Sequence, residues 1–276
     1  MASEKSSTNQ KEEETYIACG THAQVFSIDP YTIEKRFNKR AKFDHETEIY
    51  SMLKGEWFPK VKGFTSKSIL MERFDMELFL LLAERHEGRF TEERARVIIK
   101  LMVEAVAALH ELGIAHLDIK LENFLVNIHP LRLVIADFDT ATSDSYTNAF
   151  LGTVQFMAPE VLNCYFNEVV DYDSKKSDMW SLALAIFIVL VGYPPVNVAT
   201  IQNIEIKNTK VSGCRLYYYI LNEDWSSFWS SLHIEHISTE SKLFLQRLLC
   251  SDPDKRMTAS DLLSHPWFAG PECTSL

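Results

Sequence analysis

The spacing of apolar residues divides the chain into two parts with different patterns. Between Tyr16 and Phe74 the apolar positions are typical of short strands, as in the alternating segment 23–28. One helix is predicted within this part, from Phe43 to Leu53. Further along the chain, apolar residues recur every three or four positions, which is the pattern of amphipathic helices. The sequence therefore predicts a small β-rich part followed by a larger helical part.

Three helices of the larger part carry signals at their ends. Thr91 is expected to cap a long helix that ends near Gly113, and a second helix is expected over 241–249. A third begins at Thr258 with Asp261 three residues later, which resembles a capping box.

The longest apolar run, 182–191, has only ten residues. A helix of that length cannot cross a hydrocarbon core about 30 Å thick, so we expect a buried core helix there.

Composition narrows the class of protein and its partners. The chain has 276 residues, 46% of them hydrophobic and 24% charged, as in ordinary globular proteins. With 28 Lys and Arg against 38 Asp and Glu, its formal net charge is -10. This balance opposes sequence-independent nucleic-acid binding and attachment to anionic membranes. We expect neither a nucleic-acid partner nor membrane insertion.

The cysteines and the N-terminal residues bear on the cellular compartment. Five widely spaced cysteines without a C-x-x-C pair indicate a reducing compartment rather than a disulfide framework. Residues 1–14 are polar and charged, and we expect a disordered tail there, without a secretory signal. The prediction is an intracellular protein, either cytoplasmic or nuclear.

Four side chains suited to phosphoryl transfer occur in two neighbouring segments, 116–126 and 134–139. Asp118 could accept a hydroxyl proton, and Lys120 could neutralise a transferring phosphoryl group. Asn123 and Asp137 offer the oxygen ligands that Mg²⁺ prefers. Phosphoryl transfer needs positioning and charge neutralisation more than covalent chemistry from the protein. These four residues therefore form the candidate site.

Six motifs in order resemble those of eukaryotic-type protein kinases, over about residues 16–268. The catalytic-loop pattern H-R-D-L-x-x-x-N matches 116–123 with Leu117 in place of arginine, and D-F-G matches 137–139 with Asp139 in place of glycine. The other matches are A-P-E at 158–160, Gly152-Thr153, the segment 178–181 and Arg256 within 254–258, with 265–268 resembling the usual last-helix ending.

The resemblance implies an α+β, bilobal protein-kinase-like fold. A small β-rich N-lobe with one helix would cover residues 15–74, and a larger, mostly helical C-lobe would cover 75–268. Tails at 1–14 and 269–276 would flank them.

The resemblance also implies ATP and Mg²⁺ as cofactors and a protein substrate with serine or threonine. Asp118 would accept or orient the hydroxyl proton, Lys120 would contact the γ-phosphate, and Asn123 and Asp137 would hold Mg²⁺. Lys35 would hold the α- and β-phosphates and pair with a helix glutamate, either Glu46 or Glu48; we favour Glu46 because Ile49, Tyr50 and Leu53 follow it on the buried side. The remaining implied residues are Ala18, Gly20 and Val25 of the glycine-rich loop, the backbone from Glu72 to Phe74 facing adenine, the structural ion pair of Glu160 and Arg256, and Asp178 as an anchor of the catalytic loop.

Three departures from the family bear on activity and its control. Only Gly20 remains of the three loop glycines. Leu117 cannot receive an activation-segment phosphate as arginine does, so we expect that phosphorylation is not the on-switch through this route. Asp139 either adds a metal contact or repels, and it is expected to restrict the flip of the metal-binding segment that glycine permits.

Two functions stay open at this point. The first is an active protein serine/threonine kinase without arginine-mediated control of its activation segment. The second is a pseudokinase, a scaffold module that binds nucleotide or a partner without efficient transfer. Lys120 favours serine/threonine over tyrosine specificity, and a regulatory partner fits either function.

Overall fold

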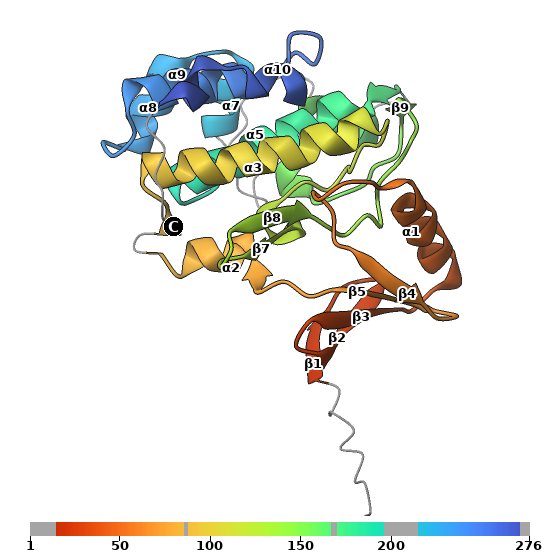
Figure 1. Ribbon diagram of the computed structural model, residues 1–276. Coiled ribbons are helices and arrows are strands. Elements are labelled where there is room, and N and C mark those ends of the chain that lie inside the picture. Colours follow the sequence, from red (N-terminus) through yellow and green to blue (C-terminus); the bar gives the residue numbers. More distant parts are fainter. Residues whose placement is uncertain (1–14, 86–87, 167–169, 196–214, 271–276) are drawn as a thin grey trace, which may run out of the picture.

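The computed structural model describes residues 15–85, 88–166, 170–195 and 215–270 (Figure 1). The predicted tail at 1–14 and the last six residues, 271–276, lie outside the described residues. The α+β architecture predicted from the sequence is confirmed, with an antiparallel sheet and one helix followed by a mainly helical part.

A five-stranded antiparallel sheet in the order β1-β2-β3-β5-β4 forms most of the first part. Val25 pairs with Ala18 on one side and with Lys35 on the other. Because directly paired residues share one face of a sheet, these three side chains lie on the same face. The strands are β1 (Thr15–Cys19), β2 (Ala23–Asp29), β3 (Thr32–Phe37), β4 (Val61–Phe64) and β5 (Ser68–Glu72).

Helix α1 (Arg40–Met52) contacts β3 and turns a glutamate toward the interior. Its buried residues are Phe43, Glu46, Ile49 and Tyr50, spaced as one helical face. The helix begins three residues before the predicted start, because its first turn is polar and lies outside the apolar pattern that predicted it.

Helix α5 (Ser174–Val191) is the centre of the helical part, with α3 (Glu92–Glu111) and α9 (Thr239–Leu248) packed against it (Figure 1). It contains the apolar run 182–191, and Trp180 and Phe187 are completely buried. A helix that is apolar around most of its circumference is expected in the interior of a protein. Across the described ranges, the structure contains no helix both long and apolar enough to cross a bilayer.

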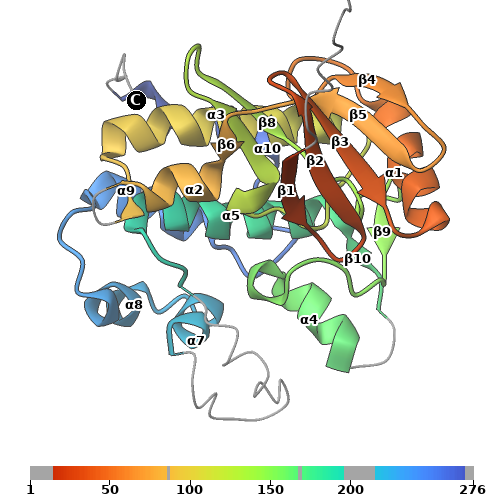
Figure 2. The same cartoon turned by 90° about the horizontal axis from the view of Figure 1, so that it is seen from below.

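A smaller sheet in the order β6-β7-β8 lies against α3 and carries the candidate site. The segment 116–123 leads into β7, and Asp137 comes two residues after β8 ends. A further ladder pairs β9 with β10, just before α5 (Figure 2). These strands are β6 (Met76–Glu77), β7 (Phe124–Asn127), β8 (Arg132–Ile135), β9 (Tyr146–Thr147) and β10 (Tyr172–Asp173). The other α-helices among the described residues are α2 (Leu78–Ala83), α4 (Pro159–Phe166), α7 (Arg215–Leu221), α8 (Trp225–Leu232) and α10 (Ala259–Leu263).

Thr258 and Thr91 both precede helices as the sequence predicts, but only Thr258 makes a capping hydrogen bond with its side chain. Thr258 and Asp261 form the predicted capping box at the start of α10. Thr91 occupies the predicted N-cap position of α3, but its side chain makes no cap hydrogen bond. The preference of threonine for N-cap positions therefore predicted the helix start correctly, although the side-chain hydrogen bond that usually explains this preference is absent at Thr91. Gly113 follows the helix with a φ of 80°, the left-handed conformation that glycine adopts without strain.

Candidate active site

The catalytic-loop residues converge around the carboxylate of Asp118. The ammonium of Lys120 lies 2.7 Å from Asp118 Oδ2, and the backbone N–H of Thr153 donates to Asp118 Oδ1 at 2.7 Å. The side-chain amide of Asn123 donates to the Asp118 carbonyl oxygen at 2.7 Å. The structure thus brings three of the predicted residues together and adds Thr153, which belongs to the activation segment.

A second group of charges joins the sheet, α1 and the segment after β8. Lys35 Nζ lies 2.7 Å from both carboxylate oxygens of Glu46 and 2.6 Å from Asp137 Oδ1. Glu46, and not its competitor Glu48, is therefore the glutamate that faces the lysine. Only eleven residues separate Lys35 from Glu46 in the sequence. This short connection suffices because only residues 38 and 39 lie between the end of β3 and the start of α1.

Burial and pairing act in opposite directions on these groups. Burial disfavours the ammonium of Lys35, but Glu46 and Asp137 outweigh it and hold its pKa above the ordinary lysine value. Burial raises the pKa of Glu46 to about 7, even with Lys35 beside it. Desolvation opposes the charge of Asp137 as well, yet Lys35, His116 and Lys120 together keep its pKa below the usual value. The ammonium of Lys120, which lies beside Asp118, is thus one of the charges that lower the pKa of Asp137.

The residues proposed as Mg²⁺ ligands have oxygens suited to that ion. Because the amide nitrogen of Asn123 donates to the Asp118 carbonyl, the amide oxygen points away from that carbonyl. Asp137 keeps a second carboxylate oxygen beyond the one that faces Lys35, and half of its side chain is exposed. The described residues contain no cluster of three or more His, Cys, Asp or Glu that could hold a metal alone. One carboxylate and one amide fit Mg²⁺ as it is commonly bound, with phosphate oxygens and water completing its shell.

The glycine-rich loop corresponds to the turn between β1 and β2. Gly20 donates its N–H to the Ala23 carbonyl at 2.9 Å, and its φ lies outside the left-handed region. A Cβ on Gly20 would come no closer than 3.7 Å to that carbonyl, which is an ordinary contact. The loop therefore keeps its turn without using the special freedom of glycine.

The predicted adenine-facing segment begins at Glu72, the last residue of β5, and continues into the connection between β5 and β6. The side chain of Glu72 pairs with Arg132 of β8, and the guanidinium of Arg132 lies 5.1 Å from the centre of the Phe74 ring. Phe74 itself is buried. These side chains turn toward the smaller sheet, and the predicted boundary between residues 74 and 75 falls within this connection.

Asp178 and the Glu160–Arg256 pair lie beneath the catalytic loop and the activation segment. Asp178 is completely buried and accepts the backbone N–H groups of His116 and Leu117 at 2.7 and 2.8 Å. The guanidinium of Arg256 donates to Glu160 through both terminal nitrogens, at 2.7 and 3.2 Å. Leu117, in the place of the family's arginine, is buried in the apolar core and donates its N–H to Asp178. Its φ is 62°, in the left-handed region.

Asp139 points toward the N-terminal part of the chain. Its carboxylate lies 3.8 Å from the ammonium of Lys42 and 3.9 Å from His22 Nε2, and Lys42 donates to its backbone oxygen at 3.0 Å. Phe138, just before it, is completely buried and contacts the rings of Tyr50, Phe58 and His116. Asp139 therefore lies against α1 and the β1–β2 turn.

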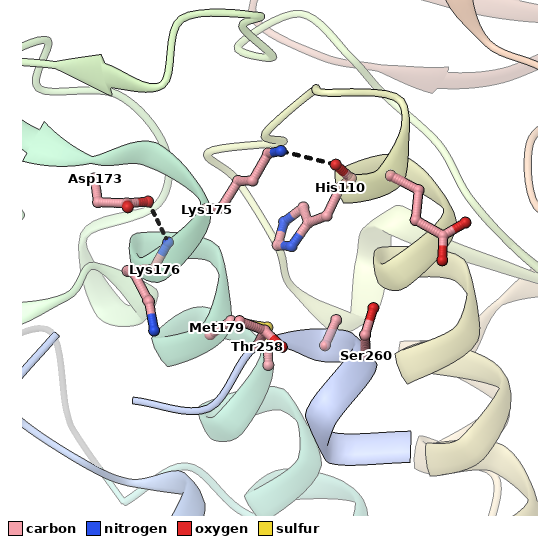
Figure 3. Close-up of a pocket in the computed structure, with 9 residues that line it drawn as sticks. His110, Asp173, Lys175, Lys176, Met179, Thr258 and Ser260 are labelled. Atoms are coloured by element: carbon pink, nitrogen blue, oxygen red, sulfur yellow. Dashed lines mark hydrogen bonds between the residues drawn. The ribbon is translucent and has the colours of Figure 1, made fainter. Parts of the chain in front are cut away.

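Several positioning residues carried no sequence signal. The His110 ring lies 3.0 Å from the Asp178 carboxylate, and the interval between them is 68 residues, so no local spacing could reveal the contact. His110 also lines a pocket of about 310 Å³ between the end of α3 and the starts of α5 and α10 (Figure 3). Lys175 donates to the His110 carbonyl in its wall. Thr153 belongs to the Gly152-Thr153 motif, but that motif by itself does not predict the hydrogen bond from Thr153 to Asp118.

Gly152 is the one position of the site where glycine is required. Its φ is 97°, and a Cβ at this position would collide with the carbonyl oxygen of Leu117. Gly113 has a similar left-handed φ, but a Cβ at that position would meet no atom within 4 Å. An alanine at Gly113 would suffer only from the left-handed backbone conformation, whereas an alanine at Gly152 would also collide with Leu117.

We predict that Gly152→Ala lowers the free energy of unfolding by at least about 2 kcal/mol more than Gly113→Ala, which should cost about 1 kcal/mol. The extra cost comes from displacing the activation segment from the catalytic loop. Urea denaturation followed by tryptophan fluorescence measures both variants. Equal losses would mean that the approach of Gly152 to Leu117 is not close in solution.

Comparison with known proteins agrees with this geometry. The protein kinase domain family matches residues 32–268. A probable myosin light chain kinase of Dictyostelium discoideum is 32% identical over 254 residues, covering 86% of this chain and 66% of that protein. MAP kinase-activated protein kinase 2 of Oryctolagus cuniculus is 33% identical over 207 residues, covering 72% of this chain and 52% of that protein.

Relatives differ in how much of their length the chain spans. A probable serine/threonine-protein kinase of Dictyostelium discoideum, fhkE, is 34% identical over 65% of this chain, but the match covers only 24% of that protein. A crystal structure of the Rad53 kinase domain superposes with a TM-score of 0.65 at 24% identity, covering 92% of this chain and 88% of that one. The match to the family over most of its length shows that this chain belongs to the protein kinase family.

Proposed function

We propose that the protein is a serine/threonine kinase that transfers the γ-phosphoryl group of Mg-ATP to a hydroxyl of a protein substrate. The observation that carries the proposal is the convergence of Asp118, Lys120 and Asn123 with the Lys35–Asp137 pair. A relative named as a probable serine/threonine-protein kinase supports the same substrate class.

Nucleotide binding follows from the charges on the β-sheet side of the site. Lys35 stays protonated and is held in place by two carboxylates, so it is ready to bind the α- and β-phosphates. Ala18 and Val25 lie on the same sheet face as Lys35 and would cover the nucleotide. The backbone from Glu72 to Phe74 would face adenine. Asn123 and Asp137 would hold Mg²⁺, which neutralises charge on the phosphate oxygens.

The orientation of Asp118 suits it to receive the substrate hydroxyl. Thr153 N–H and Lys120 each occupy one of its oxygens, which fixes the plane of the carboxylate. The side-chain amide of Asn123 also approaches Asp118 Oδ2 at 3.4 Å, so Oδ1, which accepts from Thr153 N–H, is the oxygen better able to accept a substrate O–H as well. Lys120 also donates to Thr153 Oγ1 at 2.9 Å, which holds its ammonium beside Asp118, where it would neutralise charge on a phosphoryl group near the acceptor.

The remaining predicted residues support this site from below. Asp178 would hold the catalytic loop, and Glu160 with Arg256 would clamp the end of the activation segment. The described cysteines Cys19, Cys164 and Cys250 are free thiols, which supports a cytoplasmic or nuclear location.

Asp118→Asn should abolish transfer, because the amide cannot accept the hydroxyl proton as the carboxylate does. The measurement is incorporation of labelled γ-phosphate into casein by the purified chain with Mg²⁺. The variant should keep the thermal stabilisation by Mg-ATP, since Asp118 is not proposed to bind nucleotide. Stabilisation by Mg-ATP without transfer in the wild type would instead identify a pseudokinase.

We further propose that activity does not depend on phosphate paired with the residue before Asp118. Leu117 is a buried aliphatic side chain, so no guanidinium is present there to bind such a phosphate.

The chain treated with phosphatase until mass spectrometry finds no phosphate should therefore keep its specific activity within about twofold. The same chain after incubation with Mg-ATP is the control. A large loss on phosphatase treatment would contradict the proposal.

A further inference from the structure

The position of the activation segment controls the geometry of Asp118. Thr153 N–H binds Asp118 Oδ1 at 2.7 Å, and Gly152 next to it packs against the Leu117 carbonyl without room for a side chain. A displacement of residues 144–153 would therefore move the donor that orients Asp118. Because Leu117 cannot bind a phosphate as arginine does, other contacts must hold this segment in place.

Hydrogen bonds between neutral groups join the segment to the residues just before and at the start of α5. Tyr146 and Thr147 pair with Asp173 and Tyr172 in the β9–β10 ladder. Ser174 donates its N–H to the Ser145 carbonyl at 3.0 Å and its hydroxyl to the Asp144 carbonyl at 2.8 Å.

Tyr172 reaches furthest along the segment. Its hydroxyl donates to the Ala149 carbonyl at 2.7 Å, four residues before Thr153. The side chain is only 4% exposed, and burial raises its pKa, so the hydroxyl stays a proton donor. Ala149 in turn donates its N–H to Thr147 Oγ1 at 3.2 Å, which closes a compact turn around the accepting carbonyl.

The residues that follow Tyr172 are themselves fixed. The Asp173 carboxylate accepts the Lys176 N–H at 2.9 Å as the N-cap of α5, and Lys175 donates to the His110 carbonyl at the end of α3 (Figure 3). Because α5 is buried along nearly its whole length, β10 cannot shift without disturbing the core.

We propose that Tyr172 is a positioning residue, which through the Ala149 carbonyl holds the activation segment in place for Asp118 and for the protein substrate without phosphate. The inference rests on the proposed kinase activity and names the contact that substitutes for the arginine–phosphate pair of the family. Ser174 supports the same segment at its other end. The nucleotide side of the site does not depend on this contact, because Lys35, Glu46 and Asp137 are held by one another.

Tyr172→Phe removes only the hydroxyl and is the decisive variant. Tyr193→Phe is the control for loss of a tyrosine hydroxyl away from the segment; that hydroxyl lies 3.5 Å from the Leu232 carbonyl oxygen, and Tyr193 is 40% exposed. Phosphatase-treated wild type and both variants are compared for the KM of casein, the KM of ATP, kcat and thermal midpoint. We expect Tyr172→Phe to lower kcat/KM for casein roughly three- to tenfold with the KM of ATP unchanged. Ser174→Ala should act in the same direction.

The proposal is overturned if Tyr172→Phe behaves like Tyr193→Phe toward casein, or if the KM of ATP rises in proportion. Amide hydrogen exchange separates this inference from the proposed activity. Tyr172→Phe should speed exchange over residues 144–153 relative to Tyr193→Phe, whether or not the wild type phosphorylates casein. Unchanged exchange there would reject the positioning role, and absence of transfer by the wild type would reject the proposed activity alone.

Discussion

The buried ammonium of Lys35 links three elements that are distant in the sequence. A desolvated charge is tolerated only when carboxylates pair with it, and here Glu46 of α1 and Asp137 after β8 both do so. Removing either acid would leave a buried charge without full compensation. The need to pair the Lys35 ammonium with two carboxylates therefore holds α1 against β3. The same need holds the segment after β8 near both of these elements.

A second constraint operates around the catalytic loop, where carboxylates bind backbone N–H groups. Asp178 binds two consecutive N–H groups of the catalytic loop, and Gly152 packs against the next carbonyl. Asp118 is then oriented by Thr153 and Lys120. Lys120 lies beside Asp118 and, with Lys35 and His116, also helps to keep the pKa of Asp137 below its usual value.

The sequence predicted features that depend on local spacing and could not predict those that depend on the packing of distant segments. The capping box at Thr258 is local and was found, and so was the buried face of α1 that carries Glu46. The contacts of Tyr172 with Ala149, of His110 with Asp178 and of Asp139 with Lys42 join separate elements. Their residues have no periodicity or spacing that marks them as partners. At Thr91 a local preference gave the helix start correctly, although the hydrogen bond that explains the preference in general is absent there.

We propose that these charges converge to bind a nucleotide together with Mg²⁺. Isothermal titration calorimetry of the full chain with ATP, in the presence and absence of Mg²⁺, measures this binding. We expect at least about tenfold tighter binding with Mg²⁺, and loss of that difference in Asp137→Asn. Equal ATP affinity with and without Mg²⁺, or no binding in either condition, would contradict it.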